Sequence, residues 1–86
     1  MSFEIVDITD ILDNNMFTEQ KFLDSVNNHN WGKYQDKKVL VRGCASRIIP
    51  PWAYMIISVK LFPVVKSIRF GNEHDNIIVY RNKIKE

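Results

Sequence analysis

The segment 39–71 places the strongest constraint on how this chain can fold, because two strand-like runs flank a dense apolar stretch. The first run is apolar without clean alternation, which is typical of a strand covered on both faces. Pro51 suits the first turn of a helix, and Pro63 disfavours helical geometry in the residue before it. A unit this compact predicts a parallel, right-handed β-α-β crossover, with strands at about 38–44 and 67–71 and a helix at about 51–62.

An amphipathic helix is predicted ahead of this unit. Thr18 is a favourable N-cap, and Phe17 before it can pack on Phe22 as a hydrophobic staple. Apolar residues then recur at helical spacing opposite polar ones. A cluster of asparagines follows, and asparagine tolerates the left-handed conformation that ends many helices. Together these features predict a helix at about 18–28.

Strand-like residues also lie near both ends of the chain. Residues 3–6 predict a strand, and 8–12 either continue it or form a helical turn. After a polar loop, an apolar run predicts a C-terminal strand at about 77–81, antiparallel to the strand before it. These elements predict an α/β fold with a small sheet, and the absence of a linker or repeat predicts a single domain over residues 1–86.

The composition is that of a folded protein with mixed surface charge. Hydrophobic residues make up 45% and charged residues 26% of the chain, and the formal net charge is +2. This charge argues against nucleic acid as the partner. A single cysteine cannot form an internal disulfide, the first residues show no signal-peptide pattern, and the longest apolar stretch is too short to span a bilayer. We therefore expect a cytoplasmic protein without membrane contact.

Several segments, in order along the chain, resemble the signature of an uncharacterised bacterial family, domain of unknown function 2480. The resemblance runs from about Phe3 to Arg81. The segments that carry it are Asn28-His29-Asn30-Trp31, Tyr34-Gln35-Asp36-Lys37-Lys38-Val39, Gly43-Cys44, Ile49-Pro50-Pro51-Trp52-Ala53-Tyr54-Met55 and Phe70-Gly71. The resemblance implies an accessory role near the machinery that assembles iron–sulfur clusters, but it implies no defined activity.

The chain departs from this family pattern in two ways. Longer members contain two such modules, whereas this chain has one, so the resemblance implies that two copies pair as an isologous homodimer. Longer members also carry a Gly-Glu-Pro-Cys segment after the last crossover strand. Here the corresponding segment is Gly71-Asn72-Glu73-His74, with His74 in the place of that cysteine.

The predicted topology gathers polar residues at one edge of the sheet. Cys44 follows the first crossover strand and His74 follows the second, so parallel strands would bring both to the carboxyl edge, where crevices form in open α/β sheets. Ser46 and Arg47 lie in the same loop as Cys44. These four residues form a candidate functional crevice, with a reactive thiol, a partial metal site or an anion pocket as its possible chemistries. The structural alternatives to these chemistries are that Cys44 is a small buried hydrophobic residue and that His74 is a solvated loop residue.

The predicted helix at 51–62 is apolar on nearly all sides. One stripe is expected to pack on the sheet and comprises Trp52, Met55, Ile56, Val59 and Phe62. A second stripe comprises Tyr54, Ile57 and Leu61. Either the first helix covers this second stripe, or the stripe forms an interface with a protein partner or a second copy.

Two functions from different classes follow from these observations. The first is a small non-catalytic binding, scaffold or accessory protein, linked through the resemblance to iron–sulfur cluster assembly or sulfur handling. The alternative is a thiol-dependent enzyme or sulfur carrier centred on Cys44. The sequence contains no catalytic constellation, and one cysteine and one histidine supply at most half of a tetrahedral zinc site. We therefore expect no metal, no cofactor and no catalytic residue.

Overall fold

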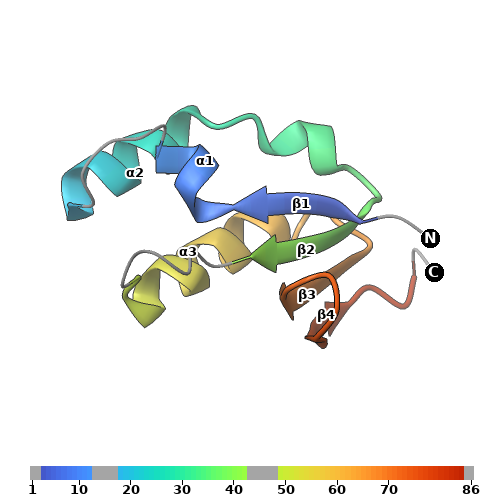
Figure 1. Ribbon diagram of the computed structural model, residues 1–86. Coiled ribbons are helices and arrows are strands. Elements are labelled where there is room, and N and C mark those ends of the chain that lie inside the picture. The colour runs from blue at the N-terminus through green and yellow to red at the C-terminus, as the bar shows by residue number, and fades with distance from the viewer. Residues whose placement is uncertain (1–2, 13–17, 43–48, 85–86) are drawn as a thin grey trace.

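The protein has an α/β fold with a four-stranded mixed sheet (Figure 1). The computed structural model describes residues 3–12, 18–42 and 49–84. Eight elements follow one another in these ranges: β1 (Glu4–Asp7), α1 (Ile8–Leu12), α2 (Glu19–Asn28), the 3-10 helix η1 (Trp31–Tyr34), β2 (Lys38–Arg42), α3 (Pro51–Leu61), β3 (Ser67–Gly71) and β4 (Asn76–Arg81). The predicted fold class is confirmed, and 8–12 forms a short helix instead of extending the first strand.

The sheet order is β1-β2-β3-β4, and each strand pairs with its neighbour in the sequence. β1, β2 and β3 run parallel, and the arrowheads of β1 and β2 point the same way in Figure 1. β2 and β3 lie on either side of α3 in the chain, so the parallel direction predicted for this unit is confirmed. Its right-handedness stays a prediction. β4 returns antiparallel to β3, again as predicted, with an irregular register between Ile68 and Arg69.

The helix α2 begins as the sequence predicts. The Thr18 hydroxyl accepts a hydrogen bond from the backbone N–H of Lys21 at 3.2 Å, which satisfies one of the unpaired donors at the helix start. The expected staple from Phe17 lies outside the described residues. At the other end, the indole N–H of Trp31 donates to the Val26 carbonyl at 2.8 Å and ties η1 to the last turn of α2.

One hydrophobic core joins the helices to one face of the sheet. Val39 and Val41 in β2 belong to it, whereas Leu40 between them points to the opposite face, as the period of a strand requires. Core residues from the other elements are Val6, Ile8, Ile11, Phe22, Val26, Tyr34, Ala53, Ile57, Leu61, Val65 and Ile68. The two longer helices meet through Phe22 and Trp52, whose rings contact edge to face with centroids 5.7 Å apart.

The opposite face of the sheet carries Leu40 together with its register partners Ile5 and Arg69. Leu40 is fully buried, so this strand is covered on both faces as predicted. The guanidinium carbon of Arg69 lies 5.5 Å from the centroid of the Phe3 ring. This cation–π contact is in the range that stabilises such pairs. None of the helices that the structure describes has the length and apolar character needed to cross a bilayer.

The helix α3 packs only in part by the predicted stripe, of which Trp52 and Ile56 are partly buried against the core. Its buried residues are Ala53, Ile57 and Leu61, spaced four apart. The prediction that Met55, Val59 and Phe62 pack on the sheet is therefore wrong: they are 68%, 71% and 55% exposed. We call these three residues the exposed stripe.

Only one of the three residues of the predicted interface, Tyr54, Ile57 and Leu61, is accessible on the surface. Ile57 and Leu61 are fully buried inside the chain, so neither side chain can reach a partner. The prediction is wrong for these two residues. Tyr54 is half-buried and contacts Phe70 of β3, with ring centroids 4.9 Å apart.

Candidate functional site

The carboxyl ends of β1, β2 and β3 lie at one edge of the sheet, because these strands run parallel and in register. His74, in the turn after β3, belongs to this edge as predicted. The other three residues of the predicted crevice, Cys44, Ser46 and Arg47, lie outside the described residues. The proximity of the thiol to the imidazole, and thiol chemistry at Cys44, therefore stay predictions.

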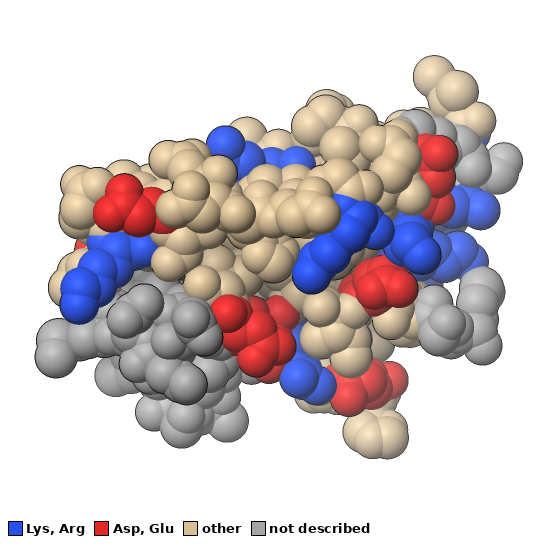
Figure 2. Space-filling view, turned by 90° about the horizontal axis from the view of Figure 1, so that it is seen from above, with Lys and Arg blue, Asp and Glu red and all other residues tan. Residues whose placement is uncertain are grey.

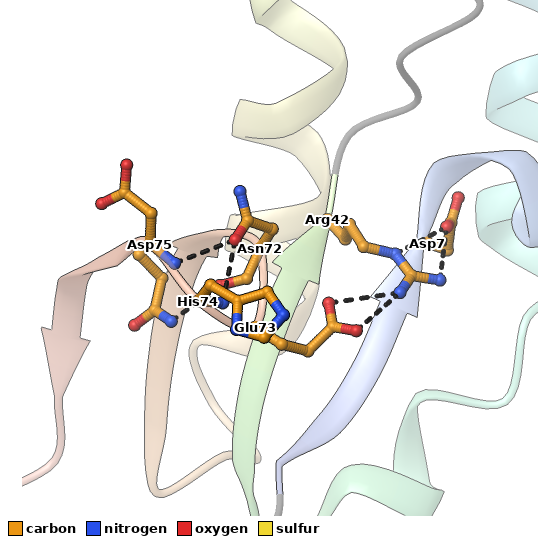
Figure 3. A network of polar contacts seen from close by, with 7 residues as sticks. Asp7, Arg42, Asn72, Glu73, His74 and Asp75 are labelled. Atoms are coloured by element: carbon orange, nitrogen blue, oxygen red, sulfur yellow. Dashed lines mark hydrogen bonds and ion pairs between the residues drawn. The ribbon is translucent and has the colours of Figure 1, made fainter.

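Arg42 joins the ends of three strands at this edge (Figure 3). Its Nε donates to Oδ2 of Asp7 at 3.0 Å, and Nη2 lies 3.0 Å from the same oxygen. On its other side, Nη1 lies 3.3 Å from each carboxylate oxygen of Glu73. The hydrogen bonds to Asp7 and then to Glu73 raise the pKa of Arg42 above its ordinary value. Sequence reasoning missed this network, although Asp7 and Arg42 are the last residues of adjacent parallel strands.

The turn between β3 and β4 is organised by Asn72. Its side-chain oxygen accepts hydrogen bonds from the backbone N–H groups of His74 at 2.8 Å and Asp75 at 2.9 Å. The Asn76 side chain donates to the Asn72 carbonyl at 2.8 Å. His74 is exposed, in agreement with the alternative prediction that it is a solvated loop residue. Among the described residues, no group of three or more His, Cys, Asp or Glu is arranged to hold a metal ion.

An open apolar groove runs between α3 and the sheet, away from this polar edge. Its volume is about 460 Å³, and we call it the α3 groove. The side chains that line it are Val41, Pro51, Tyr54, Met55, Ser58, Val59, Ile68, Phe70 and Val79. A second hollow continues from Val59 toward Phe62 and Tyr80, whose ring centroids are 4.6 Å apart. Tyr54 is thus the predicted interface residue that the structure places on an accessible apolar surface.

Residues of α3 and of the strands β2, β3 and β4 line the groove. Met55 and Val59 of the exposed stripe contribute the α3 side, and Val79 contributes the β4 side. Contiguous exposed apolar surface of this kind marks sites of binding to proteins, ligands or membranes. Because the helix is apolar on nearly all sides, the sequence indicated that such a surface exists. Which face of the helix is exposed depends on the tertiary packing and could not be predicted from the sequence.

A second polar contact lies near the end of α2 and closes its last turn onto η1. Nε2 of His29 is 2.8 Å from the hydroxyl oxygen of Tyr34. Burial lowers the pKa of His29, and the charge of Lys33 lowers it further. Burial likewise raises the pKa of Tyr34, with a further contribution from Glu4 and Asp10. This pair holds helix ends together and does not face the α3 groove.

Comparison with known families agrees with the resemblance seen in the sequence. The sequence model of a family described as protein of unknown function (DUF2480) matches residues 1–86. The chain belongs to this family. The description of the DUF2480 family assigns no activity. No curated protein and no solved structure matches the chain.

The distribution of charge gives no sign of a polyanion site on the face that Figure 2 presents. There, Lys and Arg alternate with Asp and Glu and do not form a broad patch of one sign. A nucleic-acid site requires clustered positive charge to neutralise phosphates.

Proposed function

We propose that this DUF2480 protein is a non-catalytic binding protein that works by contact through the α3 groove. The observation that supports this function best is the exposed stripe on α3, which borders the groove although the same helix buries Ile57 and Leu61. Full burial of a Met, Val or Phe side chain is worth about 1.5–3 kcal/mol relative to leaving it in water. Covering the stripe would therefore contribute substantially to binding.

The character of the groove supports a protein surface as its occupant. Its lining is mainly apolar and open to solvent, and it includes the aromatic residues Tyr54 and Phe70. Protein interfaces are enriched in aromatic residues and Met at their centres and depleted there in charge. We propose a protein partner in the cytoplasm. The place in iron–sulfur cluster assembly or sulfur handling implied by the family resemblance is part of the same proposal.

A capture experiment with charge-matched variants tests this function. The tagged chain is incubated with native lysate of the cells that produce it, and bound proteins are quantified for the wild type, Val59→Glu and Asn27→Glu. Val59 lies on the groove, whereas Asn27 is exposed on α2, so both variants add one negative charge to a helix surface. Circular dichroism confirms that each variant is folded.

We expect at least one protein, either a different protein or a second copy of this chain, to bind the wild type and Asn27→Glu. The same protein should be lost from Val59→Glu. A charge in the groove must be desolvated when the partner covers it, and this costs more than an unfilled apolar contact. Equal capture by all three chains would contradict a role for the groove. A wild type that binds neither another protein nor itself would contradict the proposed function as a whole.

A further inference from the structure

We propose that the α3 groove binds an acidic amphipathic helix of another protein. The inference rests on the proposed function of the groove and adds the chemistry of its partner. Three observations support it: the strip of sheet left open beside α3, the irregular register of β4, and the basic charge of the segments around the groove.

The sheet is open beside α3 over a width that suits one helix. Ile68, Phe70 and Val79 form the sheet side of the groove, and Met55 and Val59 form its α3 side. All six residues of β4 are at least partly exposed. Neighbouring helices pack with their axes about 8–10 Å apart, which is about the spacing across two strands. A partner helix beside α3 would therefore lie over β3 and β4 and extend the helical layer.

The groove is also long enough for a helix with three apolar contacts. Pro51 lines the groove at the start of α3, and the second hollow reaches Phe62 just after its end. The 11 residues of α3 span about 16 Å. Helices that bind in grooves make their contacts through apolar residues at i, i+4 and i+7, which cover about 10 Å.

The register of β4 favours a helix over an added strand. The ladder pairs Ile68 with Tyr80 and then Arg69 with Ile78, so Val79 is an extra residue. Val79 and Tyr80 both border the second hollow beside α3. A bulge interrupts the regular edge that an added strand needs and directs an additional side chain to one face. Here that additional side chain enlarges the apolar surface of the groove.

The segments around the groove carry basic charge alone. Residues 37–72, which include β2, α3 and β3, contain seven Lys or Arg and no Asp or Glu. Residues 76–84, which include β4, contain two Lys or Arg and again no Asp or Glu. All ten acidic residues of the chain therefore lie in other segments. An apolar groove in such a setting is complementary to a partner with apolar contacts and acidic flanks.

Two lysines lie near the end of the groove at Tyr80. The backbone N–H of Asn82 donates to the Lys66 carbonyl at 2.8 Å, which places Lys66 beside Asn82 and Lys83 at the end of β4. Within the described part of the chain, neither lysine forms an ion pair. Carboxylates at the corresponding end of the partner helix would meet both of them. Opposite charges across an interface select the partner and fix its direction.

Photo-cross-linking identifies the segment that the groove binds. The tagged chain carries p-benzoylphenylalanine in place of Met55 or, as a control, of Asn27, and is irradiated in native lysate of the cells that produce it. Digestion and mass spectrometry then identify the attached segment. A synthetic peptide of that segment is titrated with the wild type, Lys66→Glu, Lys83→Glu and Lys21→Glu. Lys21 is exposed on α2, so its variant changes the net charge equally at a distant surface.

We expect the Met55 position, and not the Asn27 position, to attach a segment with more Asp and Glu than Lys and Arg, and with apolar residues at i, i+4 and i+7. The peptide should gain helical circular dichroism when it binds. Lys66→Glu and Lys83→Glu should each raise its dissociation constant about fivefold, because an attractive charge pair becomes repulsive. Lys21→Glu should raise it by less than about twofold. Circular dichroism of each variant alone checks its fold.

The contrary outcomes separate this inference from the proposed function. An attached segment that is extended, basic or part of a second copy of this chain would overturn the inference and leave the proposed function standing. Equal weakening by all three charge variants would do the same. Binding to vesicles of phosphatidylcholine and phosphatidylglycerol in equal parts, without an attached protein segment, would assign the groove to a membrane and overturn both. A chain that binds neither protein nor vesicles would also overturn both.

Discussion

At the residue scale, the end of β3 requires that position 71 carries no side chain. The φ of Gly71, +139°, lies in a region that L residues rarely adopt, and an added Cβ would overlap the carbonyl oxygen of Asp75. Gly71→Ala is expected to lower the free energy of unfolding by about 1–3 kcal/mol. Urea denaturation followed by circular dichroism measures this loss.

Gly32 in η1 provides the matched control for this substitution. A Cβ there would approach only the flexible side-chain oxygen of Asn30, at 3.3 Å. Gly32→Ala should change the free energy of unfolding by less than about 0.5 kcal/mol. Equal losses in the two variants would contradict the conformational argument for Gly71.

His29 gives the protein a predicted pH dependence. Its pKa is lowered in the folded state by burial and then by Lys33, so in the weakly acidic range the unfolded chain binds more protons than the folded chain. The contribution of His29 to stability is therefore complete above the unfolded pKa of about 6.5 and decreases as the pH falls toward its folded pKa. Denaturation between about pH 5 and 8 should show this decrease.

The chain contains a second histidine that serves as the control for this prediction. His29→Gln should remove the contribution of His29 to the pH dependence. His74→Gln changes an exposed turn residue and should preserve it, because His29 remains. A stability that falls equally with pH in both variants would show that other groups cause the decrease.

At the scale of elements, α3 has two apolar faces with different roles. Ile57 is fully buried, whereas Val59 is 71% exposed. Ile57→Ala should lower the free energy of unfolding by about 2–4 kcal/mol, because it leaves a cavity in the core. Val59→Ala should change it by less than about 0.5 kcal/mol at a protein concentration low enough to keep the chain monomeric. Similar losses in both variants would contradict the assigned faces.

These two faces also show where sequence reasoning succeeded and where it failed. The start of α3 followed from Pro51, and the apolar runs around it predicted the parallel strands. The buried face could not be predicted, because apolar residues surround α3 and periodicity then gives no direction. The tertiary packing of α3 decides which face is buried.

The polar edge of the sheet was predictable in part. Parallel strands fixed the edge at which His74 lies, but the sequence did not indicate that Arg42 would bind carboxylates from two other segments. The end of β1 had to be known first, since Asp7 pairs with Arg42 only in the observed register. The groove between α3 and β4 likewise depends on the tertiary arrangement, because its lining comes from four separate elements.

At the scale of the whole molecule, Met55 and Val59 of α3 and Val79 of β4 line one apolar surface, the α3 groove. The proposed function requires that a protein partner covers this surface when the protein works.

Capture of a protein by the wild type, Val59→Glu and Asn27→Glu tests this proposal most directly. We expect a protein to bind the wild type and Asn27→Glu and to be lost from Val59→Glu, because the added charge of Val59→Glu lies on the groove. Equal capture by all three chains would contradict it.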